Sequence, residues 1–430
     1  MKKMLSLLFS IPLFVNAQDD GIRFEGNLSW QEIKAKAKAE NKFIFVDCYA
    51  TWCGPCKWMD KNVYPKDTVG RYVNAQFISL KVQMDTSISD DVFITNWYPT
   101  AHAFQELYKV NAYPSYLFFS PDGEIVHKGV GAKRVNDFMS LTADAVNPQY
   151  QYYTLMSRYL QGDLDYAKML QLANEADNIG NTKGAEQVAD DYLHNYLDQL
   201  NEERPLARKD LLFIYRFIKR LRSSDKIFAM CYRKPDLVDS IREITKFGRY
   251  CVDNVITREE ITLMVNMAKK NGSAPDWQAI THIIKKKYGK DYAEYSVINA
   301  KVDWYKYKKE WGDYVCSLIQ QVEDTKNEKL QPGVGNMIYW NNNAFAIFTY
   351  SNKKSDLEKA LSWVDLSSSL NDDPSGEIMD TKANILYKLG RKEEGIRLEE
   401  RTVAKAPKRK DIRDNYEKMQ KDLPTWPVNP

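Results

Sequence analysis

The sequence predicts an α/β domain over roughly the first third of its 430 residues, followed by an all-helical region. The stretch from Phe43 to Lys57 opens with β-branched and aromatic residues typical of a buried strand, and continues as Trp-Cys-Gly-Pro-Cys, where a helix should begin. The run Ser115–Ser120 leads through a Pro-Asp-Gly turn into a second strand from Ile125. From Tyr150 onward the apolar period is helical, without a convincing strand.

Length and charge exclude some classes of protein. A chain of 430 residues is expected to hold two or three domains. Lys and Arg together number 61 and Asp and Glu 58, giving a net charge of +3, so the strongly basic surface of a nucleic-acid-binding protein is absent. With 44% hydrophobic residues the chain has enough apolar sequence to build cores.

Residues 1–17 have the pattern of an export signal. Lys2 and Lys3 precede an apolar run from Leu5 to Val15, and a small-residue cleavage site ends at Ala17. The run is too short to span a bilayer, and no cysteine follows the cleavage site to carry a lipid. We therefore predict a periplasmic or otherwise exported protein with no membrane span after removal of the signal; an uncleaved anchor is the alternative.

The predicted domain begins with a helix and the organising strand. Ser29 and Glu32 form a capping box, which predicts a helix through Glu40. The strand from Phe43 follows, and the cysteines after it lie at a helix N-terminus, where partial positive charge stabilises the thiolate of Cys53. Cys56 lies one turn further on, close enough to exchange disulfides with Cys53.

Pro55 fits a helix start, where a backbone N–H is not needed. The same cysteine spacing occurs at zinc sites, but zinc needs four ligands, and neither a second Cys-x-x-Cys nor a pair of histidines follows. We therefore predict no metal at this site. The four histidines show no ligand spacing and are assigned no role.

The remaining elements complete a central mixed sheet with helices on both faces. Residues 76–85 are predicted as a strand, and two helical stretches are expected between Asp85 and Pro114. After the hairpin from Ser115, a helix over residues 136–146 closes the domain at Asn147-Pro148. The predicted domain therefore covers residues 18–147.

Three landmarks in register resemble the thioredoxin superfamily: the Trp-Cys-Gly-Pro-Cys segment, Asp47 six positions before Cys53, and Tyr113-Pro114 before a strand, which looks like the family's cis-proline. Lys81 matches the lysine that approaches the buried aspartate in thioredoxin. The opening helix and strand resemble those of exported thioredoxin-like domains.

The resemblance implies a thiol–disulfide oxidoreductase. Cys53 would be the nucleophile and Cys56 the resolving thiol, with Asp47 accepting a proton and Lys81 as its partner. The residues expected to bind substrate are Trp52, Gly54, Pro55, Tyr113 and Pro114. Protein disulfides would be the substrates and an upstream thiol the reductant, with no cofactor, because the electrons reside in the dithiol. The Gly-Pro pair favours a reductase; an oxidase or isomerase is the alternative.

The predicted helical region contains a repeated sequence pattern of one tyrosine followed by two small residues. Tyr159, Gly162 and Ala167 have the same spacing as Tyr387, Gly390 and Gly395, and this pattern resembles tetratricopeptide repeats. We predict an all-helical domain over residues 148–332 and tetratricopeptide-like repeats over residues 333–430. The whole chain resembles exported bacterial proteins that join a thioredoxin-like domain to such a region. The region is expected to dock a protein partner. Alternatively, the chain is a helical adaptor in which the α/β domain is a scaffold.

Four further cysteines are predicted to have structural roles. Cys48 alternates with Asp47 along the strand and so faces away from the dithiol. Cys231, Cys251 and Cys316 lie in helical sequence without regular spacing. Buried free thiols are the favoured interpretation, and a Cys231–Cys251 bridge remains the alternative.

Overall fold

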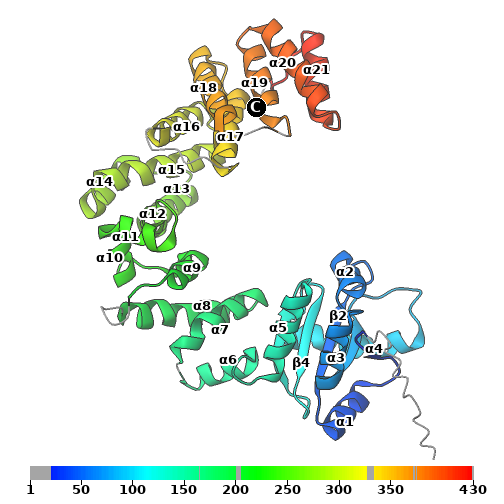
Figure 1. The fold of residues 1–430 in the computed structure, drawn as a ribbon. Helices are drawn as coiled ribbons and strands as arrows, with labels where there is room; N and C mark the ends of the chain where they lie inside the picture. The colour runs from blue at the N-terminus through cyan, green and yellow to red at the C-terminus, as the bar shows by residue number, and fades with distance from the viewer. Residues whose placement is uncertain are drawn as a thin grey trace, which may run out of the picture. The chain divides into compact units, whose positions relative to one another are not determined.

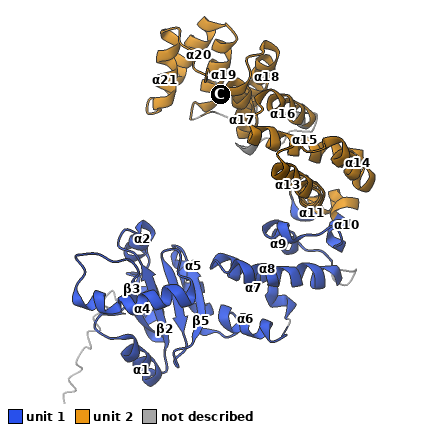
Figure 2. Ribbon diagram, turned by 180° about the vertical axis from the view of Figure 1, so that it is seen from behind, with its two compact units in different colours: residues 1–230, 240–243 blue, residues 231–239, 244–430 orange. Residues whose placement is uncertain are grey.

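The computed structural model describes residues 21–163, 165–199, 205–326, 334–370, 373 and 375–428. The predicted export signal lies outside these residues. The chain divides into two compact units, one of residues 1–230 with 240–243 and the other of residues 231–239 with 244–430 (Figure 2). The domain boundaries expected at residues 147 and 332 stay predictions.

The first unit contains a five-stranded mixed sheet (Figure 1). Its strand order is β1 (Phe24–Glu25), β3 (Phe77–Gln83), β2 (Phe43–Tyr49), β4 (Ser115–Phe119), β5 (Ile125–Val130). The first three strands are parallel, and β4 and β5 are antiparallel to their neighbours. Strand β2 lies in the centre with both faces covered, which explains why it reads as an almost continuous apolar run.

Helices cover both faces of this sheet, as predicted. Their bounds are α1 (Trp30–Glu40), α2 (Gly54–Asn62), α3 (Asp67–Gln76), α4 (Val92–Tyr108) and α5 (Val135–Val146). One core packs α1 and α4 against the sheet through residues such as Ile33 and Phe104. A second core, on the opposite face, contains Met59 of α2, Val73 of α3 and Phe138 of α5. The predicted α/β class is thereby confirmed.

Local signals placed several elements correctly. Ser29 and Glu32 form the predicted capping box, and α1 ends with Asn41 in the left-handed region, at φ 49°. The two helical stretches expected between Asp85 and Pro114 are a single helix, α4, which starts after the N-cap Asp91. The short strand β1 and the separate helix α3 were not predicted.

The edge strand β5 packs against α6 (Tyr152–Leu160), and the end of α7 (Tyr166–Asn178) lies close by. The Tyr152 N–H donates to His127 Nδ1 at 3.0 Å. Burial lowers the pKa of His127 to about 4, so the ring is neutral and can accept this hydrogen bond. The α/β domain and the first helices therefore form one packed unit.

Lys128, which is only 2% exposed, lies at the same junction. Its Nζ donates to the carbonyls of Tyr108 at 2.9 Å, Lys109 at 3.0 Å and Ile179 at 3.2 Å. These carbonyls belong to the C-terminal ends of α4 and α7, where backbone acceptors lack helical partners and the helix dipole favours a cation. One buried ammonium group therefore joins β5 to both helix ends.

The rest of the chain is helical, as predicted, and none of the described residues after Val130 forms a strand. The first unit continues with α8 (Thr182–Asp191) and α9 (Arg208–Arg216), and α10 (Lys226–Arg233) spans the division between the units. Short π- and 3-10 turns lie between these helices, at Tyr192–Tyr196, Leu197–Gln199 and Ile218–Arg220. Within the described ranges, no helix combines the length and apolar character needed to cross a bilayer.

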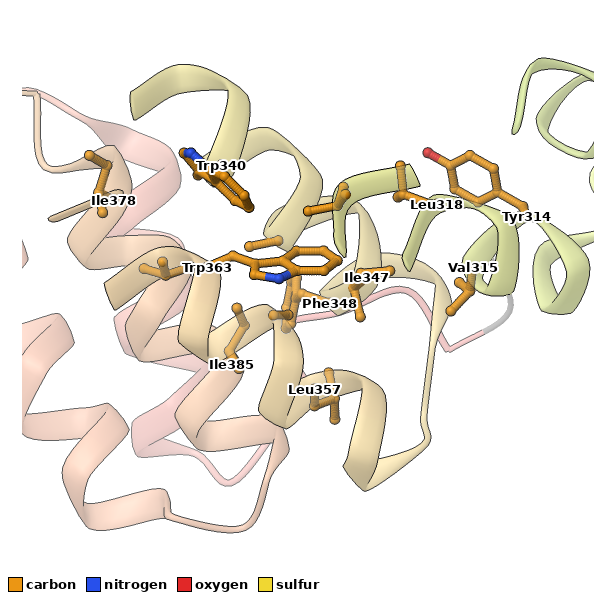
Figure 3. Packing of buried hydrophobic residues seen from close by; sticks show 14 of the residues in the cluster. Tyr314, Val315, Leu318, Trp340, Ile347, Phe348, Leu357, Trp363, Ile378 and Ile385 are labelled. Carbon is orange, nitrogen blue, oxygen red and sulfur yellow. The ribbon is translucent and has the colours of Figure 1, made fainter. Parts of the chain in front are cut away.

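The helix α11 (Pro235–Arg242) begins in the second unit and ends in the first. The other helices of the second unit are α12 (Phe247–Ile256), α13 (Thr262–Asn271), α14 (Trp277–Tyr288), α15 (Lys290–Lys308), α16 (Trp311–Lys326), α17 (Val334–Tyr350), α18 (Lys354–Leu370), α19 (Glu377–Lys388), α20 (Lys392–Lys405) and α21 (Lys410–Gln420). From α14 onward, each helix packs against the next one in the chain. A π-turn at Thr257–Ile261 precedes α13. One core of this unit is built around the fully buried Trp340 and Trp363 (Figure 3).

Gly395 allows α19 and α20 to approach closely. A Cβ atom at this position would lie 2.8 Å from the carbonyl oxygen of Ala383 and 3.0 Å from Tyr387 Cβ. The small residue predicted from the sequence pattern is therefore required here by helix packing. The likeness to tetratricopeptide repeats itself stays a prediction.

Glu399 of α20 is a buried carboxylic acid. Its side chain is 0% exposed, and neither carboxyl oxygen has a hydrogen-bond partner among the described residues. Burial, followed by the nearby carboxylates of Asp380 and Asp411, raises the pKa of Glu399 to about 10. The side chain is therefore protonated at neutral pH.

We expect Lys128→Met to lower the free energy of unfolding of the first unit by about 2–4 kcal/mol, because three carbonyls at helix ends, one of them in a fully buried hydrogen bond, lose their donor. Urea unfolding followed by circular dichroism measures this effect. The exposed Lys183 on α8 supplies the control: Lys183→Met should be close to neutral. Equal effects of the two changes would contradict the role given to Lys128.

Glu399→Gln should stabilise the second unit, and more so as the pH rises. The raised pKa means that the stability of the neutral form is fully present below pH 4.5 and is lost as the pH rises through about 10. A neutral amide avoids this loss, so we expect a gain of roughly 2–4 kcal/mol at pH 8 and a smaller gain at pH 5. Thermal unfolding at both pH values tests this, with the exposed neighbour Glu400→Gln as the control.

Candidate functional site

The two cysteines lie where the central strand passes into α2. Strand β2 ends at Tyr49, and Cys53 is the N-cap of α2, with Pro55 in its first turn. The Cys56 N–H donates to Cys53 Sγ at 3.1 Å. The sulfur of Cys53 therefore occupies the place of a capping oxygen, in the partial positive charge of a helix N-terminus.

Cys53 and Cys56 form a disulfide with an S–S distance of 2.07 Å and a Cα–Cα distance of 5.3 Å. The two residues are only 2% and 3% exposed. The side chains packed around them are Ala50, Tyr49 and Tyr113. The apolar residues packed around the sulfurs thus come from the end of β2, from the residue after it and from the segment before β4.

The predicted substrate-binding residues surround this disulfide. Trp52 is 70% exposed, and its ring contacts the edge of Tyr113 with centroids 5.8 Å apart. Gly54 and Pro55 are also exposed. The Tyr113–Pro114 peptide bond is cis, as predicted. Because Ser115 pairs with Cys48 at the end of β2, Pro114 lies beside the strand end that leads to the dithiol.

Asp47 is buried on β2, at 1% exposure. Its Oδ2 lies 3.7 Å from Lys81 Nζ, and its Oδ1 has no hydrogen-bond partner among the described residues. Burial raises the pKa of Asp47 to about 7, and the attraction of Lys81 opposes this shift. The carboxyl group can therefore gain or lose a proton near neutral pH.

Lys81 has a second partner that the sequence did not indicate. Parallel pairing places it opposite Asp47 in the sheet, but its Nζ forms a closer ion pair with Asp60 of α2. It also lies 4.8 Å from the centre of the Tyr49 ring. Lys81 thus links the buried acid of β2 to the helix that carries Cys56.

The loop after β3 is attached to the active-site loop by polar contacts that the sequence analysis missed. The Thr51 hydroxyl and N–H donate to the Asp85 carboxylate at 2.5 and 3.0 Å. Asp90 accepts hydrogen bonds from Gln83 at 2.7 Å and from Tyr98 at 2.5 Å. Thr51 and Asp85 lie 34 positions apart in the sequence, so no local pattern could have revealed their contact.

Comparison with known proteins identifies the family. The sequence model of a family described as thioredoxin-like matches residues 27–121. The H-type thioredoxin of Chlamydomonas reinhardtii is 33% identical over 87 residues, which cover 20% of this chain and 74% of that protein. The chain belongs to the thioredoxin superfamily. Its thioredoxin domain contains the disulfide described above.

Two further relatives carry names from disulfide chemistry. A thiol:disulfide interchange protein, DsbD, of Pseudoalteromonas atlantica is 34% identical over 113 residues. The match spans 26% of this chain and only 17% of that protein. A putative disulphide-isomerase of Bacteroides thetaiotaomicron, solved in solution, is 35% identical, with 30% of this chain and 98% of that chain covered and a TM-score of 0.26. This chain thus matches only a small part of the interchange protein's own length.

Asp47→Asn should stabilise the thioredoxin domain, most of all at high pH. The raised pKa means that the neutral carboxyl group gives full stability below about pH 4, which is lost as the pH rises through about 7. An amide stays neutral, so the free energy of unfolding should rise by up to about 4 kcal/mol at pH 8 and by about 1.5 kcal/mol at pH 5. Urea unfolding at both pH values measures this gain.

The exposed Asp122 offers the matched change, and Asp122→Asn should leave stability nearly unaltered at either pH. A destabilised Asp47→Asn protein, or one whose gain is the same at pH 5 and pH 8, would contradict the raised pKa.

Proposed function

We propose that this protein is an exported thiol–disulfide oxidoreductase that reduces disulfide bonds in other proteins. The observation that carries the proposal is the Cys53–Cys56 pair at the N-terminus of α2, beside cis Pro114 and on the segment that follows the buried Asp47. Its export rests on the leader-like sequence of residues 1–17.

The reaction starts from the reduced dithiol. The positive end of α2 favours the thiolate of Cys53, which attacks one sulfur of a substrate disulfide. A mixed disulfide forms between Cys53 and the substrate, and the other substrate sulfur leaves as a thiolate and takes up a proton.

Resolution uses the second cysteine. Asp47, with a pKa raised to about 7, accepts the proton of the Cys56 thiol, and the resulting thiolate attacks Cys53 Sγ. The Cys53–substrate bond breaks as the Cys53–Cys56 bond forms, so the substrate leaves with two thiols. The protein is then in the disulfide state, and an upstream thiol reductant restores it; the electrons need no cofactor.

The exposed surface beside the disulfide suits an extended polypeptide. Trp52 offers an apolar platform, Gly54 and Pro55 leave the approach to the sulfurs free of large side chains, and the backbone at Tyr113 next to cis Pro114 offers β-type hydrogen bonds. Such contacts bind main chain without a strong sequence preference. The helical region is proposed to dock a protein partner or substrate, which would set the specificity.

Substitution of each cysteine distinguishes the proposed oxidoreductase from the alternative of a helical adaptor. Cys53→Ser should lower the rate of insulin disulfide reduction by about 1,000-fold or more, because the nucleophile is lost. Cys56→Ala should accumulate mixed disulfides with substrates, which mass spectrometry of protein isolated from cells can identify. The exposed Cys316 is the control, and Cys316→Ser should retain full activity.

A Cys53→Ser protein that keeps its cellular role would favour the alternative of a helical adaptor with a scaffold domain. The direction of the reaction is tested by the reduction potential of the dithiol. A reduction potential of about −270 mV would support a reductase, whereas a potential of about −120 mV would indicate an oxidase.

A further inference from the structure

Two cysteines outside the active site lie together inside the second unit. Cys231 belongs to α10 and Cys251 to α12, and both are 0% exposed. Both are free thiols in this structure, and the Cys231 side chain is the first cause of a raised pKa of Cys251, which places the two side chains close together. The cysteines are separated by 20 positions in the sequence, with no spacing that would mark them as a pair. Cys316, by contrast, is exposed, unlike the buried thiol expected from the sequence.

The backbone of α12 approaches the segment at Cys231 closely at Gly248. Gly248 lies one helical turn before Cys251, on the same side of α12. A Cβ atom on Gly248 would lie 3.3 Å from the Cys231 carbonyl oxygen and 2.9 Å from Pro235 Cα. The Asp239 carboxylate accepts from the Gly248 N–H at 2.8 Å and also binds the Lys246 N–H. The first turn of α12 is therefore held against the segment that starts at Cys231.

We propose that Cys231 and Cys251 form a second disulfide in the exported protein, one that joins α10 to α12 and is structural. The two thiols together lose two protons and two electrons as the S–S bond forms. The oxidant is another disulfide, either a small one such as oxidised glutathione or the Cys53–Cys56 disulfide of a second copy, and it is reduced to two thiols.

The surroundings determine when this bond forms. The hydrogen bond with Cys231, and then burial, raise the pKa of Cys251 far above its ordinary value, so the folded protein offers little thiolate for exchange. Oxidation therefore occurs while the chain is folding, before the thiols are buried. Once formed, the bond is shielded from reductants by the same burial, which separates it from the Cys53–Cys56 disulfide that exchanges with substrates.

The proposed Cys231–Cys251 disulfide lies where the chain passes from the first unit to the second. Cys231 is the first residue of the second unit, and residues 231–239 are followed by a short return of the chain to the first unit at 240–243. A covalent link from Cys231 to α12 would fix the start of this segment to a helix of the second unit.

The test is peptide mapping of the full-length protein after export to a bacterial periplasm. The protein is alkylated at once with iodoacetamide, digested without reductant and analysed by mass spectrometry. We expect a linked pair of peptides containing Cys231 and Cys251, and two free thiols per chain in denaturant instead of four. Recovery of both cysteines in alkylated form would overturn the proposal.

A second arm separates this result from the proposed enzyme activity. A Cys53→Ser/Cys56→Ser protein, refolded with oxidised and reduced glutathione, should form the same link, because the oxidant is then external. A Cys231→Ala/Cys251→Ala protein should keep its rate of insulin reduction but unfold at a lower temperature than the oxidised wild type. In the Cys53→Ser/Cys56→Ser protein, unfolding in denaturant with a phosphine and refolding without oxidant should likewise lower the unfolding temperature. An unchanged temperature would overturn the structural role.

Discussion

The burial of strand β2 between β3 and β4 is the constraint on which the candidate site depends. Because both faces of this strand are covered, Asp47 is removed from water, and its pKa rises to the range where it can exchange a proton. The same strand ends at the loop that positions Cys53 at the start of α2. The sheet thus supplies both the acid and the geometry of the disulfide, and β4 brings Pro114 beside them.

A second constraint is the cover over the sheet edge. Strand β5 would otherwise present unpaired backbone groups to solvent, which favours association with other chains. Packing of α6, the hydrogen bond from Tyr152 to His127 and the three carbonyl contacts of Lys128 give this strand partners within the chain. The carbonyls of Tyr108 and Lys109 precede the loop that leads to Tyr113, so the junction with the helices also supports the segment beside the disulfide.

The second unit combines aromatic cores with a few buried polar groups. Trp340 and Trp363 lie in one of these cores, and the Trp363 indole N–H donates to Glu323 at 2.9 Å. Glu399, in contrast, has no described donor and stays neutral. The neighbouring thiols of Cys231 and Cys251 form a further buried pair, which the proposed disulfide would join covalently.

The sequence by itself determined what short-range patterns encode: the α/β domain, the capping box at Ser29, the hairpin after Ser115, the helical character beyond Tyr150 and the Cys53–Cys56 pair. These features depend on residues within a few positions of one another, or on landmarks shared with a known family. Only the tertiary structure decided the partners of Lys81 and Lys128, the attachment of Asp85 to Thr51 and the contact of Cys231 with Cys251. Each of these joins residues 19 or more positions apart, so chain packing, and not local pattern, brings them together.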